Sequence, residues 1–394
     1  MLDSFQKRIK NTNQPNFPIL KKTTYLLFFL LIPCYLIGQT DSIQKKLKFS
    51  ADFKFRVEED WDSQKSDGTY RDDRTRLRYR ARLGATYAFK DWVSFGMRIR
   101  TGQANKQQDA HLTLGDQFSS VPITFEKLYA NFSYDWLSAW VGKNSFPFEM
   151  QNELFWSDNV SPEGIYFSGK FNFENDFLQS LKVNTGHFIF ATSGTSLDKD
   201  SYFEGIQLVS SHWQNRIKFF PAFYYFKNMP NIPDGNDTFN IEYAIVHMGA
   251  KVDIFKNPKI IVGFDYYQNV QDYNGNDSIP KLLQSQKTAY VANAGIGKLD
   301  KKGDWKIQLT YTYLERFAVV DYLAQNDWAR WDYSSQNSPD GRLTNFKGLE
   351  IMAGYALAEN MDLRLRFFTV EQIVTYGIAK ENGNRIRLDF NIGF

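Results

Sequence analysis

A ten-residue stretch of the sequence carries an arginine at every second position. The arginines are Arg74, Arg76, Arg78, Arg80 and Arg82, and mostly apolar residues stand between them. Side chains of a β-strand alternate between its two faces, so a strand here would have one cationic face and one mostly apolar face. A helix would scatter the same arginines around its axis. Arginine stays charged at any working pH and binds carboxylate or phosphate groups bidentately, so this face could bind or attract anions.

Other alternating segments add cations that would extend this face. They contribute Lys54 and Arg56, Arg98 and Arg100, Arg364 and Arg366, and Arg385 and Arg387. If the last strand pairs with the first, five neighbouring strands present these cations to one interior. Asp52, Asp362 and Asp389 share the same faces, which leaves an alternative in which the arginines are neutralised and only brace the wall. Close like charges repel, so we expect some pairing and favour a wall that also sets an electric field.

Catalytic and metal chemistry have little support. The four histidines, His111, His187, His212 and His247, are scattered along the chain. We expect His247 near the outward face of its strand, and the neighbouring stretch 260–267 holds no serine. The sequence has neither a nucleophile-elbow motif nor a paired His-Glu zinc motif. We therefore predict no enzyme activity, no metal site and no cofactor, and a hydrolase is the least favoured alternative.

The elements that must position the cations are strands of about ten residues. Alternating segments recur along the chain, and no apolar run of roughly 18 residues follows residue 40. Short and long connections alternate in strict order. The pattern predicts an all-β fold, a transmembrane antiparallel up-and-down β-barrel of about sixteen strands, with short periplasmic turns and long extracellular loops. Fourteen or eighteen strands remain alternatives, because the segments 137–144 and 164–173 alternate weakly.

The N-terminal segment has the layout of a secretory signal. Lys21 and Lys22 precede a short apolar run, so we expect residues 1–38 to be a signal peptide and residues 39–394 to be the barrel. A lipoprotein box at Cys34 is a weaker alternative, because a proline precedes the cysteine. Loss of residues 1–38 removes five positive charges and one negative charge, which changes the net charge from +3 to −1. A nucleic-acid partner therefore has no support in the composition.

The aromatic residues indicate how the barrel would sit in a membrane. Five tryptophans flank the short turns: Trp92, Trp136, Trp140, Trp213 and Trp305. Tryptophan prefers the interface between lipid and water, so we interpret these five as a girdle at the periplasmic rim. The last segment, 385–394, alternates as far as the terminal Phe394, and this ending resembles the assembly signal of outer-membrane proteins.

The stretch 74–169 resembles a family of bacterial outer-membrane proteins known as the putative porins, which is more distantly similar to the phosphate-selective porins O and P. The resemblance lies in RARLG at 80–84, FGMRIRTG at 95–102, KLYA at 127–130, VGK at 141–143, FWSD at 155–158 and PEG at 162–164. It implies a water-filled diffusion channel for small hydrophilic or anionic solutes in the bacterial outer membrane. It also implies lipid and the barrel assembly machinery as partners, and analogy of fold suggests a homotrimer. We see no dense lysine array, so phosphate specificity does not carry over.

Two long connections could narrow such a channel. The connection 103–121 holds Asp109 and Asp116, and the connection 145–163 holds Glu149, Glu153, Asp158 and Glu163. Acidic side chains opposite a basic wall would give a transverse field and weak selectivity. The sequence thus predicts a porin with a modest anion preference. The alternative is a barrel with an adhesin or binding role in loop 318–345, which carries Tyr322, Trp328, Trp331 and Tyr333; for this loop we favour a subunit contact or a fold over the pore mouth.

Overall fold

The computed structural model describes residues 46–106, 108, 110–115, 120–232, 239–328 and 339–394. The expected signal peptide, 1–38, lies outside the described residues. The chain divides into the units Met1–Leu47 and Lys48–Phe394, and the second unit is the one whose fold follows.

The second unit consists almost entirely of strands. In chain order they are β1 (Leu47–Gln64), β2 (Arg74–Lys90), β3 (Val93–Thr101), β4 (Leu112–Thr113), β5 (Ile123–Tyr134), β6 (Leu137–Lys143), β7 (Glu163–Asn172), β8 (Leu178–Ala191), β9 (Ser201–His212), β10 (Ile217–Phe219), β11 (Ala222–Pro230), β12 (Asn240–Lys256), β13 (Lys259–Asn269), β14 (Thr288–Gly297), β15 (Trp305–Leu314), β16 (Phe346–Ala358), β17 (Met361–Gln372) and β18 (Asn382–Gly393). Three short 3-10 helices lie in the connections: η2 (Leu197–Lys199), η3 (Asp321–Leu323) and η4 (Asn326–Trp328). No helix in the described ranges has the length and apolar character needed to span a membrane.

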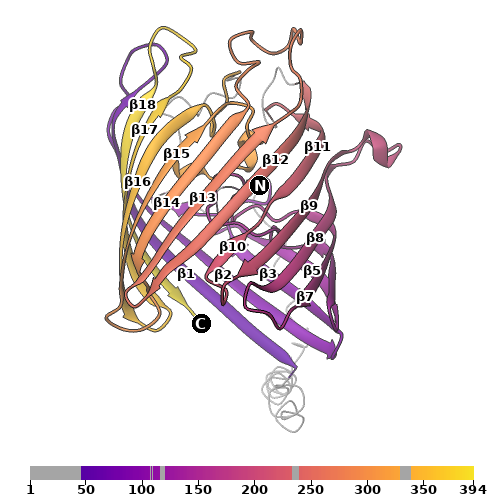
Figure 1. Cartoon of the computed structure of the whole chain (residues 1–394). Coiled ribbons are helices and arrows are strands. Elements are labelled where there is room, and N and C mark those ends of the chain that lie inside the picture. Colours follow the sequence, from indigo (N-terminus) through magenta and orange to yellow (C-terminus); the bar gives the residue numbers. More distant parts are fainter. Residues whose placement is uncertain (1–45, 107, 109, 116–119, 233–238, 329–338) are drawn as a thin grey trace, which may run out of the picture. The chain divides into compact units, whose positions relative to one another are not determined.

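These strands form one closed antiparallel barrel (Figure 1). β18 pairs with β1 from Asp52 opposite Gly393 onward, which closes the sheet and leaves no open edge. β10 and β11 both lie between β9 and β12 and form one interrupted strand. β4 pairs with β2 beyond the end of β3. In the described part of the chain the barrel therefore has sixteen spanning strands, which confirms the predicted fold class and includes the two weakly alternating segments as β6 and β7.

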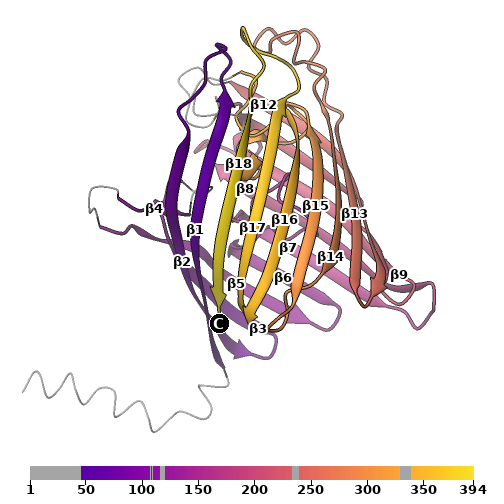
Figure 2. The same cartoon turned by 90° about the vertical axis from the view of Figure 1, so that its left-hand side faces the viewer.

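Long connections gather at one end of the barrel and short turns at the other (Figure 1). We refer to these as the long-loop end and the short-turn end. The C-terminus lies at the short-turn end, where β18 runs between β1 and β17 (Figure 2). The backbone groups of Ala51 and Phe394 exchange two hydrogen bonds of 2.8 and 3.0 Å, so the last residue belongs to the seam that closes the barrel.

The two faces of the strands divide as the alternation predicts. In β2, Arg78, Arg80 and Arg82 are buried toward the interior, whereas Leu77 and Leu83 are exposed on the outer surface. The outer belt also holds exposed tryptophans beside the short turns: Trp92, Trp136, Trp213 and Trp305. Trp140 is the exception, because it is buried and its ring packs on Phe188 at 5.6 Å between the ring centres. The assignment of Trp140 to the girdle was therefore wrong.

The core lies inside the barrel, because two long connections fold inward. The β6–β7 loop (144–162) places Phe148, Leu154, Phe155 and Trp156 in the core, and these residues pack on buried aromatic rings of the barrel wall. The β15–β16 loop (315–345) contributes a second buried segment from Phe317 to Val320. The contents of the barrel therefore differ between its two sides, with apolar loops on one side and charged strands on the other.

Candidate functional site

The charged side of the interior is made by β17, β18, β1, β2 and β3, which pair in this order. All thirteen cations expected on this wall lie on inward faces, and we refer to them as the arginine wall. The closed sheet brings them together although they come from both ends of the chain. Their apolar neighbours in sequence face outward, so the period of two along each strand is the reason for the arrangement.

Carboxylates of the same wall and of the loops pair with most of these cations. The Arg56 Nε atom lies 2.6 Å from Asp389, Arg385 Nε lies 2.6 Å from Asp60, and Arg82 Nη2 lies 2.9 Å from Glu126. Nine described carboxylates form such pairs: Asp52, Glu58, Asp60, Glu126, Asp158, Asp327, Glu350, Asp362 and Asp389. Thirteen cations thus share nine carboxylates among the residues that the structure describes, so ion pairs brace the wall extensively.

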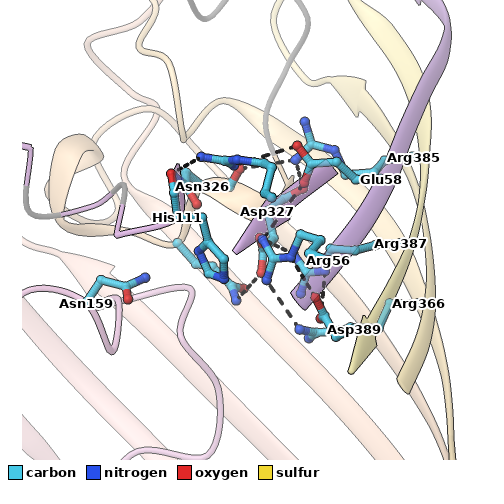
Figure 3. A network of polar contacts seen from close by, with 12 residues as sticks. Arg56, Glu58, His111, Asn159, Asn326, Asp327, Arg366, Arg385, Arg387 and Asp389 are labelled. Carbon is cyan, nitrogen blue, oxygen red and sulfur yellow. Dashed lines mark hydrogen bonds and ion pairs between the residues drawn. The ribbon is translucent and has the colours of Figure 1, made fainter. Parts of the chain in front are cut away.

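The β15–β16 loop supplies the carboxylate at the centre of this network (Figure 3). Asp327, in η4, pairs with Arg387, and its carboxylate also lies 3.7 Å from Arg56 and 3.8 Å from Arg366. The Asp327 carbonyl accepts a hydrogen bond of 3.0 Å from Arg385. Four arginines of β1, β17 and β18 therefore hold one aspartate of a loop that begins at β15.

The β6–β7 loop is attached to the opposite side of the barrel. Asp265 of β13 accepts hydrogen bonds from Gln151 and Asn152 of this loop, at 2.7 and 2.6 Å. The ring of Phe155 lies between Tyr224 and Tyr267, with ring centres at 4.7 and 5.2 Å. Hydrogen bonds to Asp265 and stacked aromatic rings together hold the β6–β7 loop inside the barrel.

The two inward loops also bind each other across the interior. The Ser157 amide donates to the Leu323 carbonyl at 2.7 Å, and the Gln325 amide donates to the Glu153 carbonyl at 3.0 Å. From the connection between β3 and β5, the Gln108 side chain donates to the carbonyls of Tyr322 and Ala324. The loops thus form a plug inside the barrel, and two cavities adjoin it.

Two adjoining cavities occupy that space. The narrow cavity has a volume of about 40 Å³ and lies between the plug and the wall; its lining includes Arg56, Arg78, Arg80, His111 and Asp327. The wide cavity has a volume of about 580 Å³ and lies toward the short-turn end. Lys54, Glu153, Asp158, Gln325 and Arg366 line both cavities, so the narrow cavity leads into the wide one. The narrow cavity is therefore far smaller than the wide one, and it lies where the plug approaches the arginine wall.

The charges of the loop groups at the constriction are set by their surroundings. Burial inside the barrel, together with the nearby carboxylates of Asp158 and Asp327, raises the pKa of Glu153 to about 7. Burial acts in the same direction on Asp327, but Arg387 and Arg56 outweigh it and hold the pKa of Asp327 well below its usual range. Burial and the neighbouring Arg56 and Arg80 lower the pKa of His111, so its imidazole is neutral at pH 7.

The comparisons with known proteins agree with this geometry. The family model described as "Putative porin" matches residues 68–240 and 239–394, which is most of the chain. The chain belongs to this family. No curated protein sequence matches the chain. Among solved structures, Pseudomonas putida OprB at high pH has a TM-score of 0.54 and 13% identity, over 89% of this chain and 95% of that one. Salmonella typhi OmpF in complex with daunomycin has a TM-score of 0.52 and 11% identity, over 88% and 97%. These likenesses show a porin-type barrel.

The acidic residues expected at the constriction of this porin-family barrel have different positions. Glu153 and Asp158 line the narrow cavity. Glu149 lies inside the barrel but pairs with Lys218 at 2.7 Å, away from the arginine wall. Glu163 does not reach the constriction: it is exposed at the start of β7 and pairs with Lys143. Asp109 and Asp116 lie outside the described residues.

The β15–β16 loop was assigned the wrong environment. A subunit contact or a fold over the pore mouth was favoured for it, yet Ala318, Val319, Leu323 and Trp328 are buried inside the barrel. Trp331 and Tyr333 of the expected adhesin cluster lie outside the described residues. The apolar composition of segment 316–324 is the signal that could have revealed this, because an exposed loop of a barrel rarely carries so many consecutive apolar residues.

His247 was also expected on the wrong face. It points inward and is buried, and its Nε2 atom lies 2.9 Å from Asp265. Its ring stacks on Tyr267 with ring centres 4.3 Å apart. The buried His247 thus contacts Asp265, the residue that accepts hydrogen bonds from the β6–β7 loop. Among the described residues there is also no group of three or more histidine, cysteine, aspartate or glutamate residues that could hold a metal ion. Family and fold point to a channel rather than an enzyme.

Several inward lysines were not recognised from the sequence. Lys251 of β12 and Lys306 of β15 line the wide cavity together with Lys54. Lys170 of β7 and Lys182 of β8 lie opposite each other in the register and share the inward face with Tyr166 and Asn184. None of them belongs to a local run of lysines that would mark it in the sequence. Closure of the barrel is what brings them to one interior.

Proposed function

We propose that the protein is an outer-membrane porin through which small hydrophilic solutes diffuse passively, with a modest preference for anions. The observation that carries this proposal is the lining of the narrow cavity, where the described residues include six cations of the arginine wall and three carboxylates. Rings or walls of like charge at a constriction set ion preference, and carboxylates on the other side weaken it. Glu153 and Asp158 supply that opposing charge, so the preference is modest.

The orientation follows the usual order of bacterial barrels, with short turns in the periplasm and long loops outside the cell. The wide cavity then opens toward the periplasmic side and the plug lies toward the cell surface. An adhesin role for the β15–β16 loop loses support, because its described aromatic residues are buried rather than displayed. The homotrimer and the contact with the barrel assembly machinery stay predictions.

Planar-bilayer recording tests the channel and its selectivity separately. The purified barrel should conduct, and its reversal potential across a KCl gradient should indicate a preference for chloride. Replacement of Arg78 and Arg80 by glutamine removes two charges that line the narrow cavity and should reduce this preference. The matched control is Arg74→Gln, because Arg74 lies on the same strand outside both cavities.

The result that overturns the channel is a folded barrel without conductance. A cation preference in the wild type overturns the assignment of selectivity. An unchanged reversal potential in the folded Arg78→Gln, Arg80→Gln variant removes the arginine wall from the conduction path.

A further inference from the structure

The wide cavity differs from the arginine wall in the pairing of its cations. Lys54 of β1, Lys251 of β12 and Lys306 of β15 line it from three directions. None of the three forms an ion pair with a carboxylate among the residues that the structure describes, whereas the arginines of the wall pair repeatedly. Glu153, Asp158 and Glu350 also line the cavity, but Asp158 and Glu350 already pair with Arg82 and Arg366, so the three ammonium groups have no direct ion pair.

The surroundings of Lys306 show this imbalance most clearly. Only Gly354 separates Lys306 from Arg364 in the register of β15, β16 and β17, and Lys251 lines the same cavity. Like charges gathered inside a barrel repel each other and oppose folding. A mobile anion that enters the cavity would remove this repulsion, and two or more negative charges would be needed to match several ammonium groups.

The same cavity offers hydrogen-bonding groups suited to hydroxyls. Gln151 of the β6–β7 loop and Asn293 of β14 both line it. The Gln151 Oε1 atom is a buried acceptor without a hydrogen-bond partner, and Asn293 Nδ2 is a buried donor without one. A hydroxyl group both donates and accepts, so it can satisfy an amide acceptor and an amide donor together.

The two amides lie side by side because the wall between them carries no side chain. A Cβ atom added to Gly263 would approach Gln151 Oε1 to 2.1 Å and Asn293 Nδ2 to 2.8 Å. Glycine at this position therefore allows both amides to meet over the strand. The volume of about 580 Å³ lies within the usual range of small-molecule sites, roughly 300–1,000 Å³.

We propose that the wide cavity is a binding site for a small hydroxylated anion with at least two negative charges, of the sugar-phosphate class. The lysines and Arg364 hold the phosphate, and the amides of Gln151 and Asn293 bind ring hydroxyls. This proposal rests on the proposed porin function and extends it. A solute that binds in the wide cavity is concentrated next to the narrow cavity, on its route through the barrel.

The test uses the purified full-length barrel and three probes: glucose 6-phosphate, glucose and inorganic phosphate. In a planar bilayer, glucose 6-phosphate added on the short-turn side should block the ion current at a concentration at least about tenfold lower than either other probe. Titration calorimetry of the detergent-solubilised barrel should give the same order of affinity, and this readout does not depend on conductance. A tenfold ratio corresponds to about 1.4 kcal/mol.

Two sets of variants locate the site. The double variant Lys251→Gln, Lys306→Gln should weaken binding of glucose 6-phosphate at least about tenfold. The control Lys170→Gln, Lys182→Gln removes the same charge from inward faces outside this cavity and should leave the affinity within about twofold. Asn293→Ala should weaken binding of glucose 6-phosphate and leave the weak binding of inorganic phosphate unchanged.

Each contrary result has a defined meaning. Equal affinity for inorganic phosphate and glucose 6-phosphate overturns the hydroxyl part of the proposal. An unchanged affinity in the folded Lys251→Gln, Lys306→Gln variant, or no binding to the wild type, overturns the site. A barrel that binds glucose 6-phosphate but does not conduct overturns the porin function and leaves the site in place.

Discussion

Removal of the charge of Asp327 is the sharpest perturbation of the constriction. Asp327 is held by Arg387, Arg56 and Arg366 through its carboxylate. Backbone hydrogen bonds, apolar contacts and the side chains of Arg385 and Gln108 also attach its loop. In Asp327→Asn these guanidinium groups lose a shared partner while they stay close to each other. We expect the β15–β16 loop to move away from the wall and the constriction to widen.

The magnitude follows from the geometry. At an effective dielectric constant of about 20, one unit-charge pair about 4 Å apart is worth roughly 4 kcal/mol before the cost of desolvation. Removal of one partner from a buried pair costs roughly 3–5 kcal/mol net. Even about 3 kcal/mol would raise the ratio of released to attached loop by a factor of about 10², since each tenfold change corresponds to about 1.4 kcal/mol.

Single-channel recording measures the result. Asp327→Asn should have a higher conductance than the wild type and a stronger chloride preference, because the wall gains one net positive charge. Asp67→Asn is the matched control, since Asp67 lies in the exposed connection between β1 and β2 and should change neither quantity. Wild-type conductance and selectivity in a folded Asp327→Asn barrel would refute the view that this aspartate holds the loop at the wall.

Three further predictions concern assembly, orientation and pH. Deletion of Phe394 removes the backbone bonds at the end of the β1–β18 seam and should lower the amount of folded, heat-modifiable barrel in the outer membrane; a wild-type amount would count against an assembly signal. Cysteines at Asp67 and Asn274, in long connections, should react with a membrane-impermeant reagent on intact cells, and labelling at Lys301 in a short turn instead would invert the orientation. Because the pKa of Glu153 is about 7, its carboxylate becomes neutral as the pH falls from about 8 to about 6, so chloride preference should rise over this interval. Glu153→Gln should abolish that rise, and a wild-type reversal potential independent of pH would contradict the assignment.

The faces of the strands could be read from the sequence because alternation is a local property. A residue and its second neighbour lie on the same face of a strand whatever the rest of the chain does. The arginines from Arg74 to Arg82 could therefore be placed inside, and the order of short and long connections gave sixteen strands. The same reasoning places single lysines such as Lys251 and Lys306 on inward faces, although nothing local shows that they share a cavity.

The paths of the loops could not be read in the same way. Phe155 and Trp156 lie in a connection without periodicity. Phe155 packs on aromatic rings of β11 and β13, and Trp156 packs on rings of β8 and β9, all of which follow later in the chain. Hydrophobic attraction has no direction, so the apolar composition of a loop indicates that it will be covered but not by what. Full burial of one large apolar side chain contributes roughly 1.5–3 kcal/mol, which explains why such a loop enters the barrel rather than extends into water.

The sequence by itself determined a membrane barrel with a cationic inner face, because the alternation of polar and apolar residues along each strand depends only on neighbouring positions in the sequence. Only the tertiary structure decided where the inward loops lie against the wall and which carboxylates pair with its cations. Asp327 meets Arg387 across 60 positions of the chain, and Arg56 meets Asp389 across 333. Partners so distant are brought together by closure of the sheet and by the inward loops, which is why the ion pairs of the wall and the lysines of the wide cavity meet only in the folded barrel.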